Sequence, residues 1–390
     1  MNKIEESGLP LAFRVNAADV LSIPPAPHRK GLDYRTAVRS LTAMQKEALV
    51  LTTAGIAWRL TSDEGPYLNG FDMAPAPLGF LTAGMVSSYM MELRALARER
   101  GITLHQVRMI QDNYYTMEGS APRGTMVAGA LPVDLEIQIE SDGETGAVNK
   151  LLQDAVHASP LNGLMRGRHE SLFTLTVNGE VADVGRVPQI PEGALSDPSE
   201  RFDDAEPRPT LDEALIRKVN AGEITEGAGG RGSSLKSDQQ RTLHVQGICE
   251  IRSDGLLAIT QHLFNPKGSS FQFIADETGE QAPDPATLIS AGLGFCFMTQ
   301  LGRYAQIMKK DLSAYRILQD TFFTPGGGSG RTGKAGEADP VETHVYLNTT
   351  EGEDFAREVV DMGEQTCFLH AFCKTDLKTR IRSTSYRQVG

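Results

Sequence analysis

The stretch Ala291-Gly292-Leu293-Gly294-Phe295-Cys296-Phe297-Met298 decides the fold, because an earlier stretch of the chain repeats it. A shift of 208 positions places Ala83-Gly84-Met85-Val86-Ser87-Ser88-Tyr89-Met90 on it, and the same shift places Ser159 on Cys367. The register holds as far as Pro132-Val133-Asp134, which falls on Pro340-Val341-Glu342. A repeat of this length predicts tandem domains rather than a solenoid.

The repeat exchanges two thiols for two hydroxyls. Cys296 and Cys367 are 71 residues apart, and so are Ser88 and Ser159, which they match. Only a thiol readily gives a nucleophilic anion near neutral pH. The sequence therefore predicts sulfur chemistry in the C-terminal copy. Ser88 and Ser159 have no recognisable acid–base partner and are predicted to be structural, degenerate counterparts.

The repeat divides the chain into four parts. We expect an N-terminal extension at 1–38, a degenerate domain at 39–185, a linker with a short helix (Leu211–Val219) at 186–238, and a second domain at 239–390. Runs of strands surround two expected helices in each domain, near 75–100 and 144–157 and near 285–309 and 352–365. The absence of βαβ alternation predicts an α+β fold. Two glycine-rich segments, 227–232 and 328–334, lack the flanking strand or helix of a nucleotide-binding loop and are predicted to be plain loops.

The amino-acid composition of the chain disfavours several classes of binding partner. The chain of 390 residues has 50 acidic and 38 basic side chains, and its net charge of −12 disfavours nucleic acid or an anionic membrane as a partner. No apolar run approaches the roughly 18 residues that span a bilayer, and the first residues lack a signal pattern. All four cysteines (Cys249, Cys296, Cys367 and Cys373) lie in the C-terminal half, unlike a secreted disulfide framework. We expect a cytoplasmic protein without a cofactor.

A lone cysteine on an apolar helix is usually a small core residue. The fixed spacing of Cys296 and Cys367 favours a reactive role instead. Gly292 and Gly294 predict that another part of the chain approaches this helix closely. Arg303, two turns after Cys296, and His370, just after Cys367, are candidate supporting residues because a nearby cation favours a thiolate.

A metal site is a rival use of the same residues. Cys367, His370 and Cys373 are spaced three apart, and Cys296 could complete a tetrahedral zinc site. The segment lacks the usual turn glycine, so our main prediction contains no metal. It places Cys373 at the start of a strand.

The helix carrying Leu288-Ile289-Ser290-Ala291-Gly292-Leu293-Gly294-Phe295-Cys296, followed by strands, a helix and Cys367-Phe368-Leu369-His370, resembles the OsmC/Ohr family. Members include thiol-dependent reductases of organic hydroperoxides that act in stress responses. The resemblance implies a curved antiparallel sheet wrapping two central helices, usually in an intertwined homodimer. One chain with two copies would be a covalent pseudo-dimer, and whether such chains pair again as a homodimer stays open.

The resemblance also implies roles. Cys296 would be the peroxidatic cysteine and Cys367 the resolving one, with a small hydroperoxide as substrate and an external thiol as reductant. The sequence departs from the family at two points. The family's peroxidases place a glutamate ten residues before the reactive cysteine, where this chain has Ala286, and the matching stretch 273–276 lacks the expected arginine. Asp284, or an arginine from the other copy, is a candidate substitute.

These departures keep two alternatives open. One is a cysteine enzyme or small-molecule binder that acts on a substrate other than a peroxide, such as a sulfur compound. The other is a structural partner protein whose cysteines are unreactive.

Overall fold

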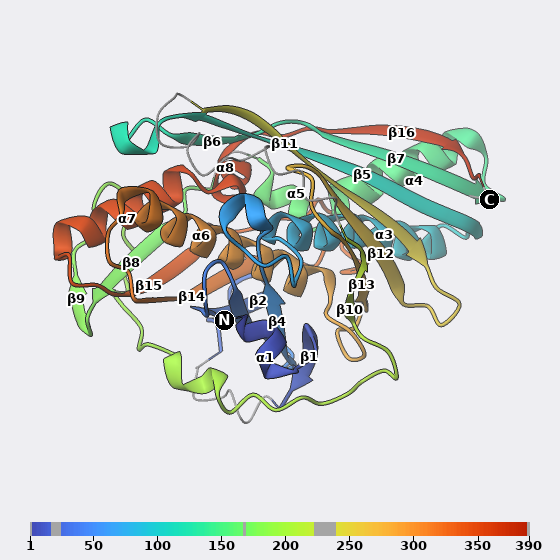
Figure 1. The fold of residues 1–390 in the computed structure, drawn as a ribbon. Coiled ribbons are helices and arrows are strands. Elements are labelled where there is room, and N and C mark those ends of the chain that lie inside the picture. The colour runs from blue at the N-terminus through green and yellow to red at the C-terminus, as the bar shows by residue number, and fades with distance from the viewer. Residues whose placement is uncertain (1, 17–24, 167–168, 222–238, 388–390) are drawn as a thin grey trace.

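The computed structural model describes residues 2–16, 25–166, 169–221 and 239–387. The fold is α+β, as predicted, and two sheets flank two long central helices (Figure 1). The helices are α1 (Lys3–Ser7), α3 (Pro77–Glu99), α4 (Thr145–Ala158), α5 (Leu161–Leu164), α6 (Pro285–Met308), α7 (Glu353–Gln365) and α8 (Phe368–Lys374). The strands are β1 (Ala12–Val15), β2 (Leu32–Ser40), β3 (Lys46–Thr52), β4 (Ala57–Ser62), β5 (Leu104–Gly119), β6 (Val127–Ala130), β7 (Val133–Ser141), β8 (Leu172–Val177), β9 (Glu180–Ala182), β10 (Ile216–Asn220), β11 (Gln239–Ile251), β12 (Leu257–Asn265), β13 (Ser270–Ala275), β14 (Ala314–Phe323), β15 (Glu342–Asn348) and β16 (Thr379–Ser385).

Each sheet contains strands from both halves of the chain. The first sheet has the order β1-β4-β3-β2-β14-β15-β8-β9, and the second has the order β10-β13-β12-β11-β5-β7-β16, with β6 paired to β5. Six strands follow the same order in both sheets: β4-β3-β2-β14-β15-β8 in the first corresponds to β13-β12-β11-β5-β7-β16 in the second. The pairing register agrees as well if β2 and β3 are shifted by 211 rather than 208 positions: Gln319 of β14 faces Thr36 of β2, and Gln111 of β5 faces Gly247 of β11.

The two long helices lie between the sheets and cross at a pair of glycines. Both helices are apolar on nearly all sides, as expected of fully buried helices, and each begins with a proline at its first turn. A Cβ atom on Gly292 would lie 2.8 Å from the backbone nitrogen of Leu81, and one on Gly84 would lie 2.6 Å from the carbonyl oxygen of Pro285. The predicted close approach at Gly292 is therefore a helix–helix contact that no larger residue would permit.

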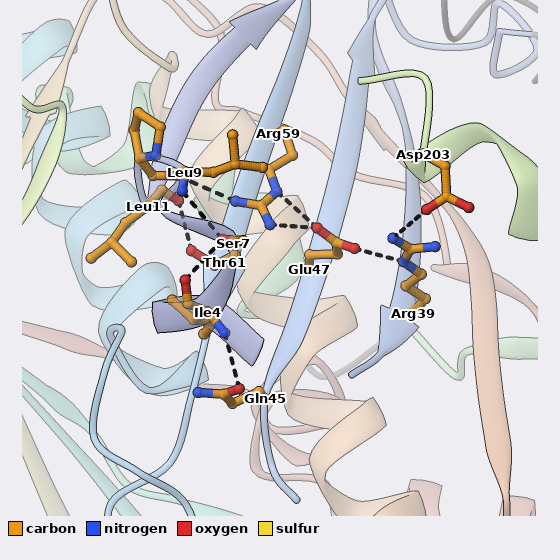
Figure 2. Close-up of polar contacts among 11 residues, drawn as sticks. Ile4, Ser7, Leu9, Leu11, Arg39, Gln45, Glu47, Arg59, Thr61 and Asp203 are labelled. Atoms are coloured by element: carbon orange, nitrogen blue, oxygen red, sulfur yellow. Dashed lines mark hydrogen bonds and ion pairs between the residues drawn. The ribbon is translucent and has the colours of Figure 1, made fainter. Parts of the chain in front are cut away.

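Ion pairs tie the strands of the first sheet together on its outer face (Figure 2). Glu47 of β3 accepts hydrogen bonds from Arg59 Nε at 2.9 Å and from Arg39 Nε at 2.6 Å, and Arg39 also reaches Asp203 at 2.9 Å. The amide of Ile4 in α1 donates to Gln45 Oε1 at 3.2 Å. The N-terminal segment is thus fastened to the start of β3.

Most predicted elements are present, and the differences come from tertiary contacts. The helix predicted at Leu211–Val219 is wrong: Ile216–Asn220 is β10, an edge strand paired with β13. Residues 32–40, expected mainly in an extension, form β2 inside the first sheet. The strand predicted to begin at Cys373 is also wrong, because this residue lies in α8. Residues 328–334 form a loop, as predicted, and 227–232 lie outside the described residues. No helix of the described chain combines the length and apolar character that crossing a bilayer requires.

Candidate functional site

Cys296 and Cys367 lie side by side in the interior. Cys296 is in the middle of α6 and is 2% exposed, and Cys367 is fully buried between α7 and α8. Burial raises the pKa of the Cys367 thiol well above its ordinary value, and the neighbouring Cys296 thiol raises it further. The backbone amides of Leu369 and His370, at the start of α8, act in the opposite direction. Two residues 71 positions apart in sequence are therefore brought together as a thiol pair.

The matching hydroxyls in the first half are paired in the same way. Ser88 lies in the middle of α3, Ser159 lies between α4 and α5, and their hydroxyl oxygens are 2.6 Å apart. Ser159 Oγ also accepts a hydrogen bond from the amide of Leu161 at 3.2 Å. Both hydroxyls are almost fully buried.

A buried lysine and two carboxylates accompany the thiol pair, and sequence reasoning missed them. Lys46, at the start of β3, is fully buried, and its ammonium group donates to the carbonyl oxygen of Met44. Burial lowers the pKa of Lys46. Glu64, Asp63 and Cys296 oppose that effect, which places all three within electrostatic reach of the ammonium group. The lysine comes from the first half of the chain and Cys296 from the second, so no local motif indicates the contact.

Glu64 also ties this cluster to the helix that carries Cys296. Its carboxylate accepts hydrogen bonds from Thr299 Oγ1 at 3.2 Å and from the Tyr67 hydroxyl at 2.8 Å. Thr299 is one turn after Cys296 on α6. The segment that follows β4 is folded back over this face because the Asp63 carboxylate accepts hydrogen bonds from the amides of Phe71 and Met73, both at 3.1 Å. The thiol pair is therefore covered by a polar cluster rather than open to solvent.

The three candidate supporting residues occupy different places. His370 is fully buried beside the Phe173 and Phe297 rings, and burial lowers its pKa to about 3, so the ring is neutral near pH 7. Arg303 is buried, which lowers its pKa to about 10, and it contacts Gln300 at 3.5 Å. Lys46 is a further buried cation near this site: burial lowers its pKa, and Cys296 is among the groups that raise it.

Asp284 does not reach the thiol pair. It precedes α6, twelve residues before Cys296, or about 18 Å at the usual rise per residue. Its carboxylate accepts hydrogen bonds from the amides of Ala286 and Thr287 and from the Tyr34 hydroxyl at 3.0 Å. These contacts hold the carboxylate at the first turn of α6, and the expectation that Asp284 replaces the glutamate that the resemblance implies stays a prediction.

The remaining cysteines are buried and free. Cys373 lies in α8 near Cys296, and burial raises its pKa to about 12. Cys249 lies in β11, where burial also raises its pKa. Across the described residues, no three His, Cys, Asp or Glu side chains are grouped as metal ligands would be. Cys296, Cys367, His370 and Cys373 all belong to that part of the chain, so the rival zinc site finds no support.

A cavity of about 400 Å³ lies beside Ser88, and both halves of the chain contribute to its walls. Neither Cys296 nor Cys367 is among its lining residues. Sequence reasoning did not anticipate it, because its walls come from β2, β3, α3 and α6.

Comparisons with known proteins find little. No protein-family model and no curated protein matches this chain. Among solved structures, an OsmC-like hydroperoxide resistance protein from Jannaschia sp. CCS1 is similar to this chain, with 20% identity and a TM-score of 0.21. The similarity covers 30% of this chain and 75% of that protein. A likeness at this level assigns neither a family nor an activity to the chain.

Proposed function

We propose that this chain is a fused pair of OsmC-like domains whose C-terminal thiol pair reduces organic hydroperoxides. The pairing of Cys296 with Cys367 carries the proposal. The repeated strand order and register support the pseudo-dimer part of it, because each half completes the sheet of the other. The domain boundaries that we propose are 39–185 and 239–390, with the first moved back to Leu32 because β2 begins there.

The reaction has three steps. The Cys296 thiolate attacks the hydroperoxide and takes one oxygen as a sulfenic acid, and the alkoxide leaves as an alcohol after gaining a proton. The Cys367 thiol then condenses with the sulfenic acid to give a disulfide and water. Two equivalents of an external thiol reduce that disulfide and leave as the oxidised disulfide of the reductant.

The surroundings of the sulfurs support this assignment. A positive charge near a sulfur favours its anion, and Lys46 is a cation within electrostatic reach of Cys296. Because both sulfurs are buried, the proposal requires the segment around Glu64 and Tyr67 to move before a peroxide can reach Cys296.

Steady-state reduction of cumene hydroperoxide, with dithiothreitol or dihydrolipoamide as reductant, tests the activity. Cys296→Ser is expected to lower turnover by at least about 10³-fold because it removes the nucleophile. Cys249→Ala is the matched control, since Cys249 is equally buried but lies on β11. Turnover that is unchanged in Cys296→Ser would contradict the proposal.

Mass spectrometry after one equivalent of peroxide tests the mechanism. The wild-type chain should lose two hydrogen atoms as Cys296 and Cys367 join. Cys367→Ser should instead gain one oxygen atom on Cys296, which dimedone would trap. A disulfide that involves Cys373 in place of Cys367 would refute the assigned resolving residue.

A cysteine enzyme or binder for another substrate is the second candidate. It is favoured by Ala286, which stands where the resemblance implies a glutamate, and by a lysine rather than an arginine near Cys296. A chain that does not react with peroxide, is alkylated at Cys296 and is protected by a sulfur-containing ligand would establish this candidate instead.

A further inference from the structure

The cavity beside Ser88 has apolar walls and a few polar groups. It lies between the start of β2, the turn after β3, the middle of α3 and the first turns of α6. Its apolar walls come from Leu32, Ile56, Met91, Pro160, Ala286 and Ile289. A volume of about 400 Å³ lies within the range of small-molecule sites, roughly 300–1,000 Å³.

The hydroxyl groups in the cavity are already paired. Ser88 interacts with Ser159, and the Tyr34 hydroxyl donates to Asp284. Ser88 faces only another hydroxyl, and burial and the Asp284 charge raise the pKa of the Tyr34 hydroxyl well above its ordinary value. Neither group is an activated nucleophile, so the cavity has the features of a binding site rather than those of a catalytic one.

The charged side chains that line the cavity are acidic. Glu277 and Asp284 line it, and none of its lining residues within the described chain is Lys, Arg or His. Glu92 lies next to it, where its carboxylate accepts hydrogen bonds from the amides of Gly328 and Ser329 at 3.1 Å. The amides at the start of α6, which would otherwise attract an anion, are occupied by Asp284.

We propose that this cavity binds a small organic cation, namely a protonated primary amine with an apolar body. The ammonium group lies beside Glu277 and Asp284, and the apolar body lies against Met91 and Ile289. The site is separate from the thiol pair, because neither Cys296 nor Cys367 lines it, although α6 contributes residues to both sites.

Isothermal titration calorimetry with three matched probes tests the proposal on the full chain. The probes are 4-phenylbutylamine, 4-phenylbutanol and 4-phenylbutyrate, which share a body and differ in charge. We expect the amine to bind at least about tenfold more tightly than the carboxylate, with the alcohol between them. Equal binding of amine and carboxylate, or no amine binding at millimolar concentration, overturns the proposal.

Two variants locate the site. Ala286→Phe fills the cavity from the first turn of α6 and should abolish binding of all three probes. Glu277→Lys changes an exposed side chain, so folding is unaffected, and it should reverse the preference between amine and carboxylate. Ala194→Trp, in a cleft on the first sheet, is the control and should bind the amine as the wild type does. Amine binding that persists unchanged in both Ala286→Phe and Glu277→Lys refutes the site.

The titration is repeated with Cys296→Ser. Unchanged amine binding there, whatever the peroxidase result, separates this proposal from the proposed function. Loss of amine binding in that variant would contradict the independence of the two sites.

Discussion

Ser88 and Cys296 occupy equivalent positions on the two central helices, but different groups surround them. Ser88 pairs with Ser159 beside a cavity of about 400 Å³, whereas Cys296 pairs with Cys367 beneath Lys46 and Glu64. The register of the sheets places Leu257 where the other half has Lys46. The site with an open cavity thus lacks the nucleophile, and the site with the nucleophile has a buried cation, which the first half of the chain contributes.

The difference in cover comes from two short segments that follow equivalent strands. After β4, the Asp63 carboxylate binds the amides of Phe71 and Met73, which closes a long loop that turns Glu64 inward. After β13, the Asp276 carboxylate binds the amides of Thr278, Glu280 and Gln281, all nearby in sequence. The shorter loop leaves Glu277 exposed. The two sites therefore differ mainly in the length of this loop, while the strand order of the sheets is the same. The longer loop covers Cys296, and the shorter loop leaves the cavity beside Ser88 open.

Among variants that test the difference between the two sites, Lys46→Met is expected to have the largest effect on the reaction rate. Removing the cation should lower the rate of the Cys296 reaction with cumene hydroperoxide about 100-fold, as loss of a buried charge-stabilising group does in other enzymes. Stopped-flow kinetics under single-turnover conditions measures this rate. Leu257→Met, at the matching position of the other half, should leave it unchanged.

Loss of folding must be separated from loss of the cation. Lys46→Met leaves Glu64 buried without its partner, which destabilises the chain. The double variant Lys46→Met/Glu64→Gln has no unpaired carboxylate at position 64, so it should fold stably. Its Cys296 should still react slowly with cumene hydroperoxide. A double variant that reacts at the wild-type rate would show that Lys46 has only a structural role.

The second prediction compares His370 with Asn162, its counterpart in the first half. Asn162 is hydrogen-bonded to Gly336, whereas both ring nitrogens of His370 lack a hydrogen-bond partner. Burial lowers the pKa of His370 from 6.5 to about 3, so the unfolded chain takes up a proton that the folded chain does not. The stability that the neutral ring contributes is complete above pH 6.5 and is lost progressively as the pH falls towards 3.

His370→Leu should remove this acid sensitivity. Between pH 7 and pH 5 the variant should lose about 2 kcal/mol less unfolding free energy than the wild type, since each pH unit below 6.5 costs about 1.4 kcal/mol per histidine. Urea unfolding at the two pH values measures the difference. Asn162→Leu is the comparison, and it should leave the pH dependence as it is in the wild type. Equal acid sensitivity in wild type and His370→Leu would mean that the ring is protonated or exposed.

The sequence predicted the α+β class and the four longest helices (α3, α4, α6 and α7) because apolar periodicity and repeat register are local signals. It also paired Cys296 with Cys367, since both the resemblance and the shared loss of thiols at Ser88 and Ser159 indicated them. It missed Lys46, because that residue is far from Cys296 in sequence and looks like an ordinary charged residue in a strand. Helix α8 was missed as well: seven residues are too few for a clear apolar period, and packing stabilises the helix.

The smallest expected effect comes from the cover over Cys296. Tyr67→Ala removes the hydrogen bond to Glu64 and the ring that fills the loop, so the covering segment should open more often. Alkylation of Cys296 by iodoacetamide should then become roughly tenfold faster, because it requires the same opening. Peptide mapping by mass spectrometry gives the rate at each cysteine. Phe71→Ala changes an exposed ring of the same loop and should leave the rate unchanged.

Cys249, buried in β11, reports global unfolding in the same experiment. If both cysteines are alkylated faster in Tyr67→Ala, the variant has lost overall stability and the loop is not the barrier. A faster rate at Cys296 alone would place that barrier between residues 63 and 73, where the two halves differ.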